Sequence, residues 1–103
     1  MDNETLRYLG LVYRGRRIAL GEDAIMLCKK QKMVMLLLAT DASENTKRKV
    51  LQIANTMQIP VIEAYSKEEF GHALGIASGV STIGIKDRKI AEKVKSQMEK
   101  KVG

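Results

Sequence analysis

The sequence predicts an α/β fold, a three-layer α/β/α sandwich around a small mixed, mainly parallel sheet. Three observations predict it. Strand-like and helix-like segments alternate along the chain, the linkers between them are short, and the apolar residues of each helical segment recur on one face. The chain has 103 residues, of which 45% are apolar, and this suits one hydrophobic core. We therefore expect residues 1–103 to form a single domain.

The first half of the pattern alternates twice between helix and strand. It predicts, in order, a helix over Thr5–Tyr13, an edge strand over Arg16–Leu20, a helix over Gly21–Lys30 and a strand over Met33–Ala39. Gly15 is placed to end the first helix. The second helix has acidic residues in its first turn and lysines at its far end, which matches the helix dipole. Met33–Ala39 is apolar without alternation, which is typical of a strand covered on both faces.

The second half continues the alternation. It predicts a helix ending at Met57, a strand over Pro60–Ala64, a short helix over Ser66–Gly75, a strand over Val80–Ile85 and a helix over Asp87–Lys101. Asp41 with Glu44, or Ser43, is placed to cap the first of these helices. Pro60 is tolerated at a strand start because its missing N–H need not join the ladder. Ser66, followed three residues later by Glu69, fits a capping box.

The chain is basic, and it lacks the residues that several kinds of site require. Lysine and arginine total 18 against 12 acidic residues, a formal charge of +6, which draws the chain toward polyanions such as RNA, DNA or an anionic membrane. Cys28 is the only cysteine, which excludes an internal disulfide and a thiolate zinc site. The longest apolar run is far shorter than the roughly 20 residues of a membrane span. The acidic N-terminus is unlike a signal peptide. We expect a cytoplasmic monomer without cofactor, metal or membrane contact.

The sequence contains no set of residues that predicts catalysis. His72 is the only histidine, which excludes a histidine metal cluster. Cys28 lies on the apolar stripe of a helix, where a free cysteine is usually buried, and a Cys28–His72 pair requires the two residues to meet in space. No phosphate-binding loop, nucleophile elbow or Gly-x-Gly-x-x-Gly turn follows a predicted strand. We therefore expect no catalytic residues and no enzyme.

Three groups of residues at the strand-to-helix turns are expected to meet at one end of the sandwich. They are Arg14–Arg17 with Gly21–Asp23, Asp41–Lys47, and Ala64–Lys67. Basic side chains bind phosphate, helix starts offer amides, and a tyrosine offers a stacking surface for a base. The candidate RNA-binding residues are Arg16, Arg17, Gly21, Glu22, Asp23, Lys47, Ala64, Tyr65, Ser66 and Lys67. The alternative interpretation is that these segments are solvated loops and helix caps. The basic residues Arg88, Lys89, Lys93 and Lys95 are interpreted as a solvated outer helix face.

Several blocks of the sequence match a known family in order along nearly the whole chain. They are Leu9–Leu11 with Gly15, Gly21–Asp23, Leu36–Lys47, Ile59–Ile62 and Ser66–Gly75. On these blocks the sequence resembles the ribosomal protein L7Ae family, which binds RNA kink-turns, and most closely its bacterial YlxQ-like members. The resemblance implies the same three-layer sandwich that the periodicity predicts.

The kink-turn contacts of that family carry over only in part. The resemblance implies a Gly-x-Asn-Glu or Gly-x-Lys-Gln turn at the start of the second helix, with a lysine about one turn later. Gly21 matches, whereas Asp23, Ala24 and Leu27 stand at the three polar positions. An acid repels phosphate, and an alanine side chain forms no hydrogen bond. The second contact, an apolar-x-Ser-Lys loop, is retained as Ala64–Lys67.

The leading hypothesis is a non-catalytic RNA-binding protein of the ribosome or another ribonucleoprotein. Its partner is a structured RNA, such as ribosomal RNA or a kink-turn. The expected phosphate contacts are Arg16, Arg17, Lys47 and Lys67. Gly21 is expected to allow close backbone approach, and Tyr65 and Ser66 to touch a base or a sugar.

Two other hypotheses belong to different classes. The first is a protein-interaction module on the same fold whose kink-turn site has decayed, which the apolar Ala24 and Leu27 suggest. The second is an enzyme, which requires a small-molecule pocket around His72 and a carboxylate.

Overall fold

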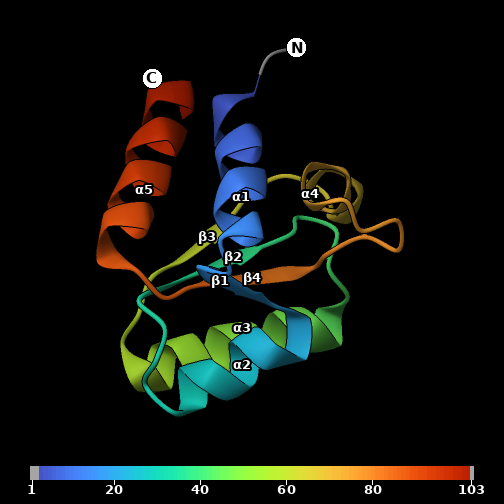
Figure 1. Ribbon diagram of the computed structural model, residues 1–103. Helices are drawn as coiled ribbons and strands as arrows, with labels where there is room; N and C mark the ends of the chain where they lie inside the picture. Colours follow the sequence, from blue (N-terminus) through green and yellow to red (C-terminus); the bar gives the residue numbers. More distant parts are fainter. Residues whose placement is uncertain (1–2, 103) are drawn as a thin grey trace.

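The computed structural model describes residues 3–102, which alternate between helices and strands as the sequence predicts (Figure 1). The elements are α1 (Glu4–Arg14), β1 (Ile18–Leu20), α2 (Gly21–Lys29), β2 (Met35–Leu38), α3 (Glu44–Met57), β3 (Val61–Glu63), α4 (Lys67–Leu74), β4 (Thr82–Ile85) and α5 (Arg88–Val102). Each predicted element is present, and each strand is slightly shorter than predicted.

The elements form three layers. Helices α1, α4 and α5 lie on one side of the sheet, and α2 and α3 lie on the other (Figure 1). The three-layer α/β/α sandwich predicted from the alternation is therefore confirmed.

The sheet is mixed, with strand order β1-β4-β2-β3. Strands β2 and β3 pair in parallel, whereas β4 pairs antiparallel with both β1 and β2. Three strands thus share one direction, but the fourth lies between two of them and runs against both. The expectation of mainly parallel pairing is wrong for this reason, because alternation along the chain does not reveal where a strand inserts.

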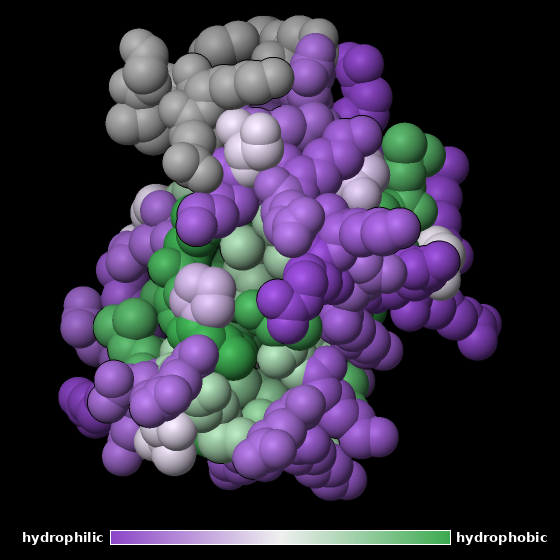
Figure 2. All heavy atoms as spheres, turned by 90° about the vertical axis from the view of Figure 1, so that its left-hand side faces the viewer, coloured by the Kyte–Doolittle hydropathy of each residue, from purple (hydrophilic) through white to green (hydrophobic). Residues whose placement is uncertain are grey.

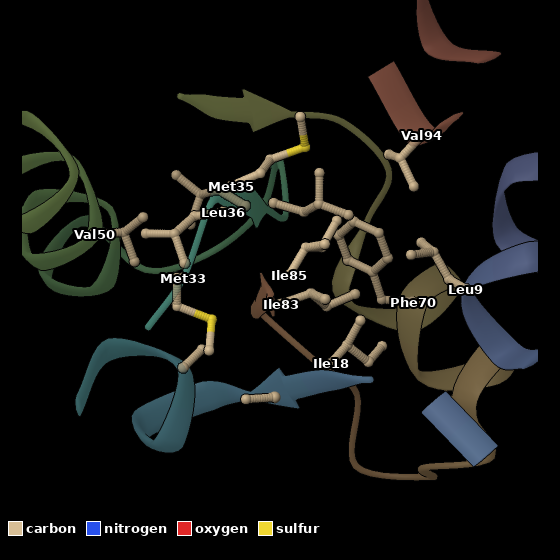
Figure 3. Packing of buried hydrophobic residues seen from close by; sticks show 14 of the residues in the cluster. Leu9, Ile18, Met33, Met35, Leu36, Val50, Phe70, Ile83, Ile85 and Val94 are labelled. Carbon is tan, nitrogen blue, oxygen red and sulfur yellow. The ribbon is translucent and has the colours of Figure 1, made fainter. Parts of the chain in front are cut away.

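The hydrophobic core has two halves, one on each side of the sheet (Figure 3). In the half that faces α1, α4 and α5, Leu9, Phe70 and Val94 pack with Ile83 and Ile85 of β4. In the half that faces α2 and α3, the buried residues include Met33, Leu36 and Val50. All four residues of β2 and all four of β4 are buried. Strand β2 is therefore covered on both faces, as its unbroken apolar run predicted.

Short polar residues begin two of the helices. The Ser43 hydroxyl accepts a hydrogen bond from the Thr46 amide (3.1 Å), which makes Ser43 the N-cap of α3. Ser66 and Glu69 form the predicted capping box of α4: the Glu69 amide donates to the Ser66 hydroxyl (3.0 Å), and the Ser66 amide donates to the Glu69 carboxylate (2.8 Å). Both caps fix the point at which the chain leaves the sheet and enters a helix.

Candidate functional site

One end of the sheet gathers the starts of three helices. We call it the turn end and define it as Gly21–Asp23, Asp41–Lys47 and Ala64–Lys67. Strand β4 begins at this end, because Thr82 pairs with Leu38 and Ile83 pairs with Leu20. Strands β1, β2 and β3 end here, and α2, α3 and α4 then begin, at the right of Figure 1. Two of the three predicted groups meet fully at this end, and the third contributes only Gly21–Asp23.

Hydrogen bonds join two segments of the turn end, the β2–α3 turn and the loop before α4. The Asp41 carboxylate accepts from the Lys67 amide (2.8 Å), and the Thr40 amide donates to the Tyr65 carbonyl (2.8 Å). The Lys67 carbonyl in turn accepts from the Val80 amide (3.1 Å). Asp41 therefore links the β2–α3 turn to the start of α4, rather than capping α3. These hydrogen bonds hold the β2–α3 and β3–α4 turns together, and an ion pair between Lys49 of α3 and Glu22 (3.1 Å) connects the start of α2.

Tyr65 and Ser66 shape the loop before α4. Tyr65 has a positive φ of 63°, and its hydroxyl donates to the Asn3 side chain (3.1 Å). Its half-buried ring meets Phe70 edge-on, with 5.6 Å between the ring centroids. The Ser66 hydroxyl accepts from the Glu69 amide within the capping box. Both side chains thus have internal contacts that set the position of Lys67, which is exposed.

The start of α2 differs from the starts of α3 and α4. Its N-cap is Leu20, and no side chain caps it. Gly21 has a φ of +57°, and no neighbouring heavy atom lies within 4 Å of the position that a Cβ would occupy. The first amides of α2 thus have no side-chain cap, and a Cβ at position 21 would face open space. Helix starts of this kind favour oxygen acceptors and negative charge.

The side-chain charge of the turn end is negative overall. Its three segments contain two lysines and four carboxylates. Lys47 forms an ion pair with Glu63 of β3 (3.3 Å), and Lys49 of α3 forms one with Glu22 (3.1 Å). Of the two lysines at the turn end, Lys67 forms no ion pair within the described part of the chain. Phosphate attraction at this end therefore depends on few groups.

The packing of Ala24 decides what the start of α2 can present. Ala24 is fully buried, and its Cβ lies 2.9 Å from where a Cβ on Gly84 would be. The glycine in β4 thus lets α2 approach the sheet closely. A longer polar side chain at position 24 has no room, and Leu27 is half-buried, while Asp23 is exposed. This packing directs the side chain at position 24 toward the sheet, so that side chain is not presented at the start of α2.

Arg16 and Arg17 do not join the turn end, and this expectation is wrong. They precede β1, whose first residue Ile18 pairs with Ile85, the last residue of β4. Arg17 forms an ion pair with Asp87 (2.9 Å), just beyond β4. The two arginines therefore lie at the opposite end of the sheet from Gly21, because the whole of β1 separates them.

The structure does not bring Cys28 and His72 together. Cys28 lies on α2 and His72 lies on α4, on opposite sides of the sheet (Figure 1). Burial raises the pKa of the Cys28 thiol, which disfavours the nucleophilic thiolate. An open groove between α1 and α4 is lined by His72, Glu68 and Glu69. The His72 side chain makes no hydrogen bond or ion pair within residues 3–98, and the Glu69 carboxylate accepts a hydrogen bond from the Ser66 amide.

The described residues contain neither a metal-binding cluster nor a membrane-spanning helix. No group of three or more histidine, cysteine, aspartate or glutamate side chains among them is arranged to hold a metal ion. No helix among them has the length and apolar character needed to cross a membrane.

Comparison with known proteins gives consistent matches. A family model described as the ribosomal protein L7Ae/L30e/S12e/Gadd45 family matches residues 4–95. RNA-binding protein YlxQ of Enterococcus faecium is 31% identical over 97 residues, which cover 93% of this chain and 92% of that protein. RNA-binding protein YlxQ of Bacillus subtilis (strain 168) is 29% identical over 92 residues, which cover 88% and 91%.

Solved structures match over nearly the whole chain. A protein with unknown function from Bacillus halodurans C superposes with a TM-score of 0.88 at 27% identity, covering 95% of this chain and 99% of that chain. The Giardia lamblia 15.5kD RNA binding protein superposes with a TM-score of 0.69 at 20% identity, covering 97% and 90%, and this likeness shows the fold alone.

Proposed function

Because the chain belongs to the ribosomal protein L7Ae/L30e/S12e/Gadd45 family, we propose that it binds structured RNA at the turn end and catalyses no reaction. The family match confirms the resemblance predicted from the sequence. Both YlxQ relatives are named as RNA-binding proteins. The proposed RNA belongs to the ribosome or to another ribonucleoprotein of the cytoplasm.

The start of α2 is the observation that carries the proposal. Its first amides have no side-chain cap, and the space over Gly21 is open. A phosphate oxygen or a base acceptor is able to approach these amides closely, which a side chain at position 21 would hinder. Lys67 lies at the same end of the sheet and supplies a positive charge to the same ligand.

Recognition at the turn end depends on shape and hydrogen bonds more than on charge. Two lysines face four carboxylates there, and no polar side chain extends from position 24. We therefore expect the chain to distinguish poorly between a kink-turn RNA and the same RNA with its sheared G·A pairs replaced by Watson–Crick pairs. Titration of both RNAs measures this. A strong preference for the kinked RNA would contradict the role given to Asp23 and Ala24.

Opposite charge changes at the turn end test the site. The probe is a fluorescent RNA hairpin with an internal loop. Lys67→Gln removes one cation and should weaken binding and reduce the log–log salt slope by about one. Asp23→Asn removes a carboxylate beside the α2 amides and should strengthen binding. The matched controls, Lys95→Gln and Glu92→Gln, lie exposed on α5 and should change the affinity much less. The site is wrong if neither turn-end variant differs from its control.

The RNA itself is best identified in cells. Cross-linking followed by sequencing of the bound RNA is expected to recover a small set of folded RNAs, and ribosomal RNA among them would support the ribosomal assignment. The Lys67→Gln chain should recover less of the same set.

A protein partner is the second candidate function. The negative balance of the turn end favours it, because carboxylates repel RNA. Purification after thorough nuclease treatment separates the two functions. Partners that persist favour a protein contact, and partners that disappear favour RNA.

A further inference from the structure

The end of the sheet opposite the turn end concentrates positive charge. We call it the basic end and define it as Arg16, Arg17, Lys30, Lys32, Lys86, Arg88 and Lys89. The pairing of Ile85 with both Ile18 and Met35 brings the residues before β1, the residues before β2 and the residues after β4 together. The Val34 amide donates to the Ile85 carbonyl (2.8 Å), which holds the chain after Lys32 beside Lys86. Figure 2 views this side of the molecule, where hydrophilic side chains surround a hydrophobic area.

Little negative charge balances these cations. All seven side chains are exposed. Asp87 is the acidic residue within this group of turns, and both of its carboxylate oxygens accept hydrogen bonds. One oxygen accepts from the Lys89 and Ile90 amides (2.8 and 3.4 Å), and the other accepts from the Arg17 side chain (2.9 Å). Of the seven cations, Arg17 alone forms an ion pair in the described part of the chain.

Helix stability does not explain the placement of these charges. Lys30 follows the last turn of α2, where a positive charge is favourable. Arg88 and Lys89 instead stand in the first turn of α5, which contains no acidic residue, although the Asp87 carboxylate just before the helix accepts from its first amides. A positive charge there opposes the helix dipole, and neighbouring cations repel one another. A bound polyanion would relieve both effects.

We propose that the basic end is a second RNA surface, which binds the phosphate backbone of a paired segment. The inference rests on the proposed function for the identity of the polyanion. It differs from that function in place and in chemistry, because the turn end offers amides and few cations, whereas the basic end offers exposed cations. The molecule measures 35 × 29 × 28 Å. One RNA that reaches both ends must therefore bend around the sandwich or contribute two separate segments.

Two double variants with equal charge change test this surface. The probe is a fluorescent, fully paired RNA duplex, titrated over a series of KCl concentrations. Lys86→Gln with Lys89→Gln should reduce the log–log salt slope by about two and weaken binding at low salt by at least about tenfold. Arg14→Gln with Lys95→Gln, exposed positions outside the basic end, should have less than half of that effect. Equal effects of the two doubles, or no effect of the first, would overturn the proposal.

A wild-type measurement avoids dependence on any variant. RNA duplex should protect Lys32, Lys86 and Lys89 from acetylation by an amine-reactive reagent more strongly than Lys95. Equal protection of all four lysines would contradict a localised surface.

An anionic membrane is the competing ligand for such a surface, and phosphatidylglycerol vesicles probe it. We expect the basic-end double variant to lose affinity for the duplex. It is overturned if that variant loses vesicle binding but retains full duplex affinity.

The two RNA proposals fail separately. If Lys67→Gln and Asp23→Asn change hairpin binding while the basic-end double variant binds the duplex normally, the turn-end site is supported and the basic-end surface is rejected. If only the basic-end double variant changes RNA binding, the basic-end surface is supported and the turn-end site is rejected.

Discussion

At the scale of single residues, one small contact determines how the second helix can be used. Gly84 in β4 lies against Ala24 of α2, and a Cβ at position 84 would lie 2.5 Å from the Met33 sulfur and 2.9 Å from the Ala24 Cβ. Both positions must be small for α2 to reach the sheet. The same closeness turns position 24 inward, so the surface of the turn depends on backbone amides.

Gly84→Ala should therefore destabilise the fold by about 1–3 kcal/mol, the usual cost of overpacking a core. Urea unfolding followed by circular dichroism measures this. Gly15→Ala is the matched control, because a Cβ there meets nothing closer than 3.6 Å and Gly15 has a negative φ of −83°. A Gly84→Ala chain as stable as the control would contradict the close approach of α2.

Thr82 carries a second residue-scale prediction. Its side chain is fully buried, and its hydroxyl has no hydrogen-bond partner among the described residues. Thr82→Val keeps the shape and removes the unsatisfied group, so it should stabilise the fold by about 1 kcal/mol. Thr82→Ser keeps the hydroxyl and loses a buried methyl group, so it should destabilise. Thermal unfolding measures both changes in stability. If both variants are more stable than the wild type, or both are less stable, this account is contradicted.

At the scale of elements, α4 is positioned by its start. The capping box of Ser66 and Glu69 and the hydrogen bond from the Lys67 amide to Asp41 hold that start against the β2–α3 turn. The helix is short, with eight residues, so these contacts matter more than its own propensity. They connect the stability of α4 to the position of Lys67.

Ser66→Ala should lower stability by about 1 kcal/mol, the usual cost of losing an N-cap. It should also weaken RNA hairpin binding, because the loop that places Lys67 is loosened. Ser78→Ala changes an exposed serine near the other end of α4 and should alter neither quantity. Normal RNA affinity in a clearly destabilised Ser66→Ala chain would show that the loop position is not used in binding.

At the scale of the whole molecule, charge is segregated between the two ends of the sheet. The turn end has two lysines against four carboxylates, and the basic end has seven cations beside Asp87. A formal charge of +6 describes neither end. Steering of a polyanion by long-range attraction should therefore deliver it to the basic end first.

Mutual repulsion at the basic end should make the stability depend on salt. Adding NaCl should raise the melting temperature by screening the repulsion, by an amount on the order of 1 kcal/mol, or about 4–8 °C for a domain of this size. Lys86→Gln with Lys89→Gln should raise the melting temperature at low salt and reduce its salt dependence. The control double variant, Arg14→Gln with Lys95→Gln, should change the melting temperature and its salt dependence less. A melting temperature that does not respond to salt would contradict the repulsion.

The sequence by itself determined the elements and their order. Period and capping are local properties, so the unbroken apolar run of β2, the capping box at Ser66 and the buried face of α5 (Ile90, Ala91, Val94 and Met98) were all predictable. The predicted family and three-layer fold are confirmed by the comparisons and the structure. Two of the three candidate groups, Asp41–Lys47 and Ala64–Lys67, meet as predicted because both follow strands that share one direction.

Only the tertiary structure decided which charges are neighbours. The insertion of β4 between β1 and β2 is a pairing between distant segments, and no local pattern encodes it. The length of β1 separates Arg16 and Arg17 from the turn end, and the pairing with β4 brings them beside Lys86 and Lys89. From the sequence alone, Lys89 is interpreted as part of a solvated helix face. The signal was present as basic residues that flank the strand ends. In an antiparallel pair, the residues before one strand lie beside the residues after the other. The pairing of β1 with β4 therefore shows that these basic residues are neighbours in space.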